Sequence, residues 1–198
     1  CMKISGRFLF FSKPSMIKTL GGGSMSIEDT ACRVWAGNVR EKERSHMRKN
    51  VVVIMTDDQG YWSLGCAGNK DAHTPNIDRL AERGIRFDNF FCVSPVCSSA
   101  RASFFTGNIP SAHGITDWLD GGDLDARKYE VTNTPAYASE REAINYLEGQ
   151  MTFTDLLREN GYTCALAGKW HLGNSVEPQH GFTKWFSVPL GHSPYIDP

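Results

Sequence analysis

The apolar run Val51–Met55 constrains the fold of this chain more than any other local feature. Its first four side chains are β-branched, and the run ends in the polar turn Thr56–Gly60. A strand that is apolar at every position suits a parallel sheet whose two faces are both covered. The run therefore predicts a buried strand of an α/β sheet.

Three helices are predicted after this strand from their end signals. Thr74 as N-cap, Pro75 at the first helical position and Gly84 at the end bound the first of them. The other two, each followed by a glycine that can end a helix, are Ser98–Thr106 before Gly107 and Thr152–Asn160 before Gly161.

Two further strands are predicted between and after these helices. Ile85–Phe91 alternates between apolar and polar residues, and Tyr162–Ala167 leads into Gly168. Strands that alternate with helices predict an α/β fold with a mostly parallel central sheet flanked by helices. In such sheets ligands bind at the carboxyl ends of the strands.

Three segments are expected to lie outside this regular framework. Residues 1–46 have little periodicity and predict a poorly ordered N-terminal extension that is not native, with Met47 as the true start. The aperiodic stretch Asp117–Gln150 predicts a long surface insertion that shapes a binding site. Val188–Pro198 is loop-like, and a sheet ending there would keep an open edge, so we expect a truncated chain.

Composition excludes several classes of protein. The formal net charge of −1 gives no general attraction to nucleic acid or to an anionic membrane, so any anion site must be local. The six cysteines show neither zinc-site nor disulfide spacing. The apolar part of Met2–Leu20 is too short for a good signal peptide. This favours a cytoplasmic protein, but the sequence does not assign a location.

Asp57 and Asp58 follow the first predicted strand directly. Adjacent carboxylates at the end of a buried strand are costly unless something neutralises them. A divalent cation with oxygen ligands, such as calcium or magnesium, would do so. A helix cap or a solvated turn is the alternative interpretation, because turns are rich in aspartate.

Cys97 opens the second predicted helix, and Arg101 lies one turn later on the same face. Backbone N–H groups at a helix start lower a thiol pKa and favour anions. The alternative is a buried structural cysteine. Lys169 and His171 lie two residues apart after a predicted strand, so on an extended segment both would point to one side.

Lysine can neutralise an anionic ester, and histidine can donate a proton to a leaving group. A solvated lysine and a packed histidine are the alternative. Taken together, the acidic pair, the helix-start cysteine with its arginine, and the Lys-x-His pair indicate hydrolysis of an anionic ester at a metal site.

The order of the motifs resembles the sulfatase family of the alkaline-phosphatase-like superfamily. The resemblance runs from about Asn50 to Pro198, which would make residues 47–198 the N-terminal part of a sulfatase catalytic domain. It rests on five ordered motifs: Thr-Asp-Asp-Gln, Thr-Pro-Asn-Ile-Asp-Arg-Leu-Ala, Ser-Pro-Val-Cys-Ser-Ser-Ala-Arg-Ala-Ser-Phe-Phe-Thr-Gly, Pro-x-x-His-Gly and Gly-Lys-Trp-His-Leu-Gly.

The resemblance implies a sulfuric ester hydrolase and a role for each matching residue. Asp57 and Asp58 would ligate calcium, together with an oxygen of Cys97 after a maturating enzyme has converted that residue to formylglycine. One hydroxyl of the hydrated aldehyde would attack sulfur, and the second would later expel sulfate. Arg101 would hold the diol, Lys169 would bind the sulfate, and His171 would hydrogen-bond the diol or assist sulfate release.

The match departs from the family in its maturation signal and in ending before the remaining metal ligands of the family, and it leaves alternatives open. The maturation signal of the family is Cys-x-Pro-x-Arg, sometimes with alanine for proline, and here Ser99 occupies that position. His113, in the Pro-x-x-His-Gly turn, is expected to be structural. A phosphonate or phosphate monoester hydrolase of the same superfamily and a non-catalytic fragment are the alternatives. Aryl sulfates, sulfated glycans and choline sulfate all remain possible substrates.

Overall fold

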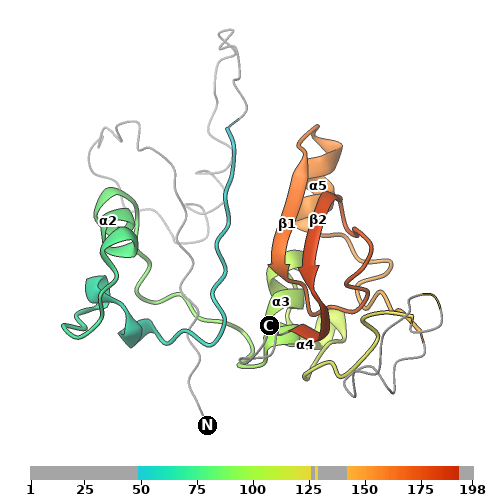
Figure 1. The fold of residues 1–198 in the computed structure, drawn as a ribbon, viewed down its shortest axis with the longest axis horizontal. Helices are drawn as coiled ribbons and strands as arrows, with labels where there is room; N and C mark the ends of the chain where they lie inside the picture. Colours follow the sequence, from blue (N-terminus) through green and yellow to red (C-terminus); the bar gives the residue numbers. More distant parts are fainter. Residues whose placement is uncertain (1–48, 126–127, 129–141, 192–198) are drawn as a thin grey trace, which may run out of the picture. The chain divides into compact units, whose positions relative to one another are not determined.

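A computed structural model describes residues 49–125, 128 and 142–191 of the chain. These residues fall into two compact units (Figure 1). The larger contains Thr56–Ser63 and the chain from Asp88 onward, and the smaller contains Leu64–Phe87 and the segment that ends at Met55. The N-terminal extension predicted for residues 1–46 lies outside the described residues.

The smaller unit contains the 3-10 helix η2 (Gly65–Ala67) and the helix α2 (Pro75–Arg83). The sequence predicted α2 with these bounds, between Thr74 and Gly84. Asp78 holds the two helices together, because its Oδ1 accepts hydrogen bonds from the backbone N–H of Cys66 at 2.7 Å and from the hydroxyl of Thr74 at 3.0 Å.

The strand predicted at Val51–Met55 is not formed. The run has no regular secondary structure, and Val52 and Ile54 are 76% and 70% exposed. A strand is stable only beside a hydrogen-bonded neighbour, and the described residues provide none for this run. The strand predicted at Ile85–Phe91 is also wrong, because a turn at residues 88–89 interrupts it and both residues there are turn formers.

The larger unit contains a parallel pair of strands, β1 (Cys164–Lys169) and β2 (Phe182–Val188), which lie side by side in Figure 1. Leu166 pairs with Trp185 and Lys169 with Val188. The parallel α/β character that the sequence predicted is thus confirmed. β1 begins and ends two residues later than the predicted Tyr162–Ala167, and the sequence analysis missed β2.

Three α-helices accompany these strands. They are α3 (Cys97–Thr106), α4 (Pro110–His113) and α5 (Phe153–Glu159), and the described part of the unit also contains the 3-10 helices η1 (Tyr61–Ser63) and η4 (Pro189–Gly191). The predicted ends of α3 and α5 are confirmed. Gly107 closes α3 with a φ of 71°, and Thr152 opens α5 through a capping box with Asp155.

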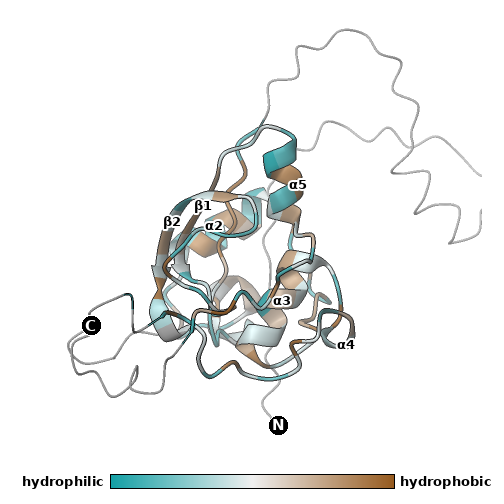
Figure 2. Cartoon of the chain, turned by 90° about the vertical axis from the view of Figure 1, so that its right-hand side faces the viewer, coloured by the Kyte–Doolittle hydropathy of each residue, from teal (hydrophilic) through white to brown (hydrophobic). Residues whose placement is uncertain are grey.

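An aromatic cluster forms the core between α3, α5 and the strands. Trp170 is fully buried, and its ring lies 5.0 Å from that of Phe105 and 5.3 Å from that of Trp185. Phe105 also stacks on Phe153 of α5 at 5.6 Å. Figure 2 shows that α5 has an apolar and a polar side, as expected of a helix that packs on one face. The core thereby fixes the start of α3 relative to the end of β1.

The predicted surface insertion at Asp117–Gln150 is built into this unit at both of its ends. Gly122 and Asp123 are buried, and their carbonyl oxygens accept hydrogen bonds from the backbone N–H groups of Ile144 at 2.9 Å and Ser175 at 2.8 Å. The expected surface segment is therefore buried at residues 122–125, whereas Asp117 and Trp118 at its start are exposed. Residues 126–127 and 129–141 lie outside the described part.

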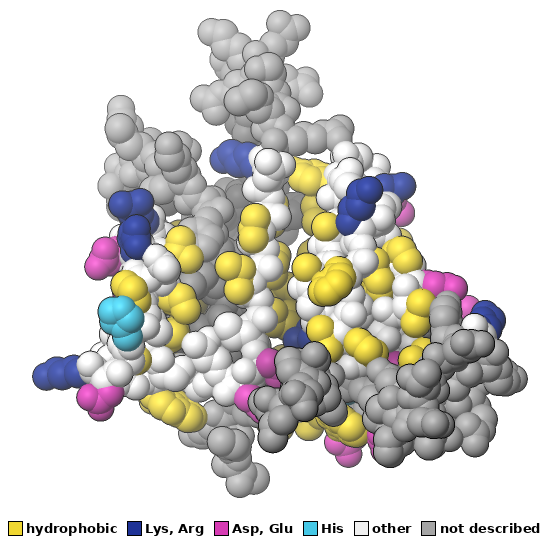
Figure 3. All heavy atoms as spheres, viewed as in Figure 1, with side chains coloured by type: hydrophobic (Ala, Val, Ile, Leu, Met, Phe, Trp, Pro, Cys, Tyr) yellow, Lys and Arg dark blue, Asp and Glu magenta, His cyan; other side chains and the backbone are white. Residues whose placement is uncertain are grey.

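Apolar side chains also remain on the surface of the larger unit. They lie exposed over the β1–β2 sheet in Figure 3, and Phe186 of β2 is 74% exposed. No helix in the described ranges combines the length and the apolar character that crossing a bilayer requires.

Candidate active site

Three charged side chains that the sequence singled out meet at the carboxyl end of β1. Oδ2 of Asp57 lies 3.2 Å from Nη2 of Arg101 and 3.0 Å from Nζ of Lys169. Nη1 of Arg101 donates a hydrogen bond to the carbonyl oxygen of Lys169 at 2.7 Å. One guanidinium therefore joins α3, β1 and the turn after Met55.

The charge of this cluster suits an anionic ligand. Burial by itself would raise the pKa of Asp57, but the hydrogen bond and charge of Lys169, followed by those of Arg101, outweigh it and lower the pKa. Asp57 is thus ionised at neutral pH. Burial lowers the pKa of Arg101, while the charge and hydrogen bond of Asp57 oppose this effect. Two cations and one carboxylate leave one net positive charge, although the whole chain is slightly acidic.

Cys97 is the first residue of α3, where helical N–H groups have no partner within the helix. The preceding residue, Val96, offers no side chain to cap them. Cys97 is a partly exposed free thiol, whereas Ser98, Ser99 and Arg101 in the same motif are buried. The hydroxyl of Ser99 has no hydrogen-bond partner among the described residues. The thiol is the accessible group at this end of the helix.

His171 lies in the segment that follows β1 and is only 2% exposed. Its backbone has a φ of 58°, so the segment is not extended at this residue. The two-residue spacing therefore does not by itself place His171 on the same side as Lys169. Nε2 donates a hydrogen bond to the carbonyl oxygen of Leu119 at 3.1 Å. Nδ1, the ring nitrogen that can accept a proton, has no partner among the described residues.

Burial, reinforced by the nearby charge of Lys169, lowers the pKa of His171 from 6.5 to about 4, against the hydrogen bond to Leu119. The unfolded chain therefore takes up a proton at His171 at a higher pH than the folded chain does. We expect the free energy of unfolding to fall as the pH drops from about 6.5 to about 4, because His171 is then charged only in the unfolded state. Arg101 and Lys169 add to this effect, and Asp57 opposes part of it.

Urea titrations of wild type and His171→Asn across this pH range test the expectation. Asparagine tolerates a positive φ and does not titrate, so the variant should show a shallower dependence on pH. Equal slopes in the two proteins would show that His171 does not cause the loss.

The two aspartates differ in their surroundings. Both are exposed, but Asp57 belongs to the charged cluster, whereas Asp58 adopts a φ of 51°. No group of three histidine, cysteine, aspartate or glutamate side chains that could hold a metal occurs in the described part of the chain. Carboxylate oxygens are the type of ligand that a hard cation binds. Asp57 and Asp58 alone, however, supply fewer than the roughly six to eight ligands that calcium takes. Any metal here needs further ligands.

His113 occupies the structural position that the sequence analysis expected. The ring is 4% exposed, Nδ1 accepts a hydrogen bond from the backbone N–H of Ile115 at 3.1 Å, and Nε2 lies 2.8 Å from the hydroxyl of Ser103. The Nε2 contact joins α4 to α3, the Nδ1 bond fixes the chain just after α4, and neither nitrogen is free for chemistry.

Trp118 and Leu119 belong to the stretch that was predicted to shape a binding site, but neither residue was singled out from the sequence. The backbone N–H of Leu119 donates to the hydroxyl of Ser98 at 3.1 Å, and the indole of Trp118 packs edge to face on the His171 ring with centroids 5.3 Å apart. The only local signal was the adjacent apolar pair Trp118–Leu119 between two aspartates. That signal does not identify a partner far along the chain.

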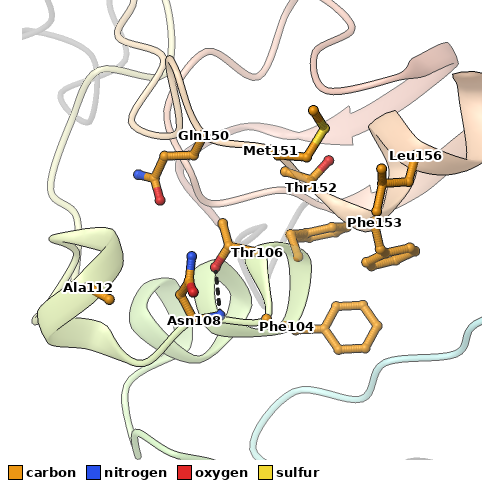
Figure 4. A pocket seen from close by; sticks show the side chains of 11 residues that line it. Phe104, Thr106, Asn108, Ala112, Gln150, Met151, Thr152, Phe153 and Leu156 are labelled. Atoms are coloured by element: carbon orange, nitrogen blue, oxygen red, sulfur yellow. Dashed lines mark hydrogen bonds between the residues drawn. The ribbon is translucent and has the colours of Figure 1, made fainter.

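A cavity of about 530 Å³ lies at the other end of α3, between the α3–α4 turn and the start of α5 (Figure 4). Roughly 14 Å of helix separates its lining residues at Thr106 from Cys97. Its lining includes Phe104, Asn108, Met151 and Leu156, and no lining residue is charged. The cavity is therefore not the place for acid–base chemistry.

Comparison with known proteins agrees with this arrangement. The sulfatase family model matches residues 49–198. Human steryl-sulfatase is 34% identical over 152 residues, human N-acetylgalactosamine-6-sulfatase 33% over 153 and human arylsulfatase H 34% over 160. These matches cover 72%, 74% and 73% of this chain but 24%, 27% and 25% of the relatives, so the chain spans about a quarter of their length. With the family motifs and the charged cluster in place, the chain belongs to the sulfatase family.

Proposed function

We propose that the whole protein is a sulfuric ester hydrolase and that this chain contributes the nucleophile and the sulfate-binding groups. The observation that supports this most directly is the cluster of Asp57, Arg101 and Lys169 beside Cys97 at the start of α3. A net positive charge next to unpaired helical N–H groups favours a sulfate anion. The sulfatases that the chain resembles add the reaction type.

Each residue has a proposed task. Lys169 and the N–H groups at the start of α3 hold the sulfate oxygens, and they neutralise charge as it builds up in the transition state. Arg101 holds the group formed from Cys97. His171 is neutral at pH 7 because its pKa is about 4, and with Nε2–H bound to Leu119 it offers Nδ1 as a proton acceptor. His171 thus serves as a base or hydrogen-bond acceptor rather than as an acid.

Cys97 is proposed to act as formylglycine, and Asp57 and Asp58 to hold a divalent metal, most consistently calcium. Such an ion would add positive charge beside the anionic ester. The low pKa of Asp57 supports this role, since a ligand must be ionised, and the oxygen donors favour calcium or magnesium over softer metals. A sulfatase-maturating enzyme acting on Cys97 is the partner that this proposal requires.

Turnover by the full-length protein tests the proposal. We expect hydrolysis of 4-nitrophenyl sulfate to exceed that of a 4-nitrophenyl phosphonate, while the reverse order would favour the phosphonate hydrolase. In parallel, the peptide that contains Cys97 should be lighter by about 18 Da, the difference between a thiol side chain and an aldehyde. Unmodified Cys97 after expression with an active maturating enzyme, together with no turnover of either ester, would favour a non-catalytic protein.

A further inference from the structure

Trp118 places a partly exposed indole beside the candidate active site. Its side chain is 46% exposed, and its ring meets that of His171 edge to face, with centroids 5.3 Å apart and an interplanar angle of 73°. A single exposed aromatic residue is common on protein surfaces and is not evidence of a site. The contacts around Trp118 therefore decide whether it belongs to the site.

The backbone around Trp118 is bonded to both sides of the site. At Leu119 the N–H donates to the hydroxyl of Ser98, which follows Cys97 in α3, and the carbonyl accepts from Nε2 of His171, both at 3.1 Å. The N–H of Trp118 itself donates to Oδ1 of Asp117 at 2.7 Å. These bonds fix the backbone of Trp118 beside the site, and the ring contact with His171 places the indole next to it.

The charges of the site determine which part of a substrate reaches this indole. The sulfate of an ester belongs with Lys169, Arg101 and the start of α3, so the remaining alcohol part has to extend away from them. Trp118 adds an apolar surface next to His171, and it carries no charge that would bind a second sulfate. A flat or cyclic group can pack on an indole face, whereas a short alkyl chain covers little of it.

We propose that Trp118 packs against a ring in the leaving group and gives the site a preference for sulfate esters of cyclic alcohols, either aryl or pyranose. This inference rests on the proposed function only in placing sulfate at the Cys97 end of α3. The contact is worth about three- to tenfold in affinity, the usual range for an aromatic ring pair.

Binding titrations with the full chain test the proposal without requiring turnover. The ligands are 4-nitrophenyl sulfate, glucose 6-sulfate, ethyl sulfate and inorganic sulfate, followed by NMR. Choline sulfate is unsuitable as the acyclic control, because its quaternary ammonium can itself bind an indole. Trp118→Ala should weaken binding of at least one ring ester about three- to tenfold and leave ethyl sulfate and inorganic sulfate unchanged. The ring ester that is affected identifies the class.

Phe186→Ala, which removes another exposed aromatic side chain, is the matched control and should change none of the four affinities. Trp118→Phe should recover most of the loss. If wild type binds the ring esters no more tightly than ethyl sulfate, or if Trp118→Ala weakens all four ligands equally, the proposal is wrong. Binding selective for rings in a protein that hydrolyses no sulfate ester would support this inference and contradict the proposed activity.

Discussion

Cys97→Ala is expected to lower sulfate ester turnover by the full-length protein by a factor of about 10⁴ or more, since it removes the only proposed nucleophile. Folding should be little affected, because Cys97 is partly exposed at the first position of α3 and its side chain caps no other group there. The measurement is the rate of 4-nitrophenol release, with thermal unfolding as a check on the fold.

Two further variants make the result specific to Cys97. Cys92→Ala removes a free thiol of similar exposure five residues earlier and should keep wild-type turnover. Cys97→Ser, purified from cells without a maturating enzyme, has a single hydroxyl oxygen and no second one to expel sulfate. It should release at most one equivalent of 4-nitrophenol. Turnover by Cys97→Ala within tenfold of wild type would exclude Cys97 as the nucleophile.

Short-range signals in the sequence were sufficient for α2, α3 and α5, whereas the short helix α4 was not predicted. α3 and α5 begin and end within one residue of prediction, because a glycine at positive φ or a capping threonine acts on its own helix turn. Cys97 could therefore be placed at a helix start from local residues. Arg101, one turn later, followed from helix geometry alone.

Strands were harder to predict because their stability depends on partners far along the chain. Val51–Met55 has a stronger β-pattern than β2, yet only β2 has a neighbour in the described residues. In β2, Phe182 and Trp185 pack against the aromatic core, and this packing is invisible in a local pattern. The composition of an apolar run indicates which side chains a strand would bury. It does not indicate whether a partner strand lies beside the run.

The same distinction applies to the candidate site. Asp57, Arg101 and Lys169 could be selected because each is a charged residue near the end of a predicted strand or the start of a predicted helix, although the strand predicted before Asp57 is not formed. The contact between His171 and the carbonyl of Leu119 spans 52 residues and uses a backbone atom that every residue possesses. No residue type marks such an acceptor, so the structure was needed to find it and to show which histidine nitrogen is free.

Arg101→Met is expected to destabilise the fold by about 2 kcal/mol and to lower turnover about 100-fold or more. Its guanidinium is buried and makes two different bonds, one to the carbonyl of Lys169 at 2.7 Å and one to Asp57 at 3.2 Å. Loss of a charged donor to a carbonyl costs about 1.5–3 kcal/mol. The ion pair adds less, because Asp57 is 41% exposed and keeps Lys169 as a partner. The variant no longer bears the free-energy cost of removing a charged guanidinium from water, and this gain offsets part of the loss.

Three comparisons separate these contributions. Arg158→Met removes an exposed arginine from α5 and should change stability by less than about 0.5 kcal/mol. Arg101→Lys keeps the charge, but a lysine ammonium lacks the planar guanidinium that reaches both the Lys169 carbonyl and Asp57. It should therefore recover only part of the stability and of the turnover. A cycle with Asp57→Asn should give a coupling energy below about 1 kcal/mol, because the carbonyl bond is unaffected by that change. An Arg101→Met protein as stable as wild type would show that the bond to Lys169 does not hold the end of β1 against α3, and the site would then need another anchor for its cations.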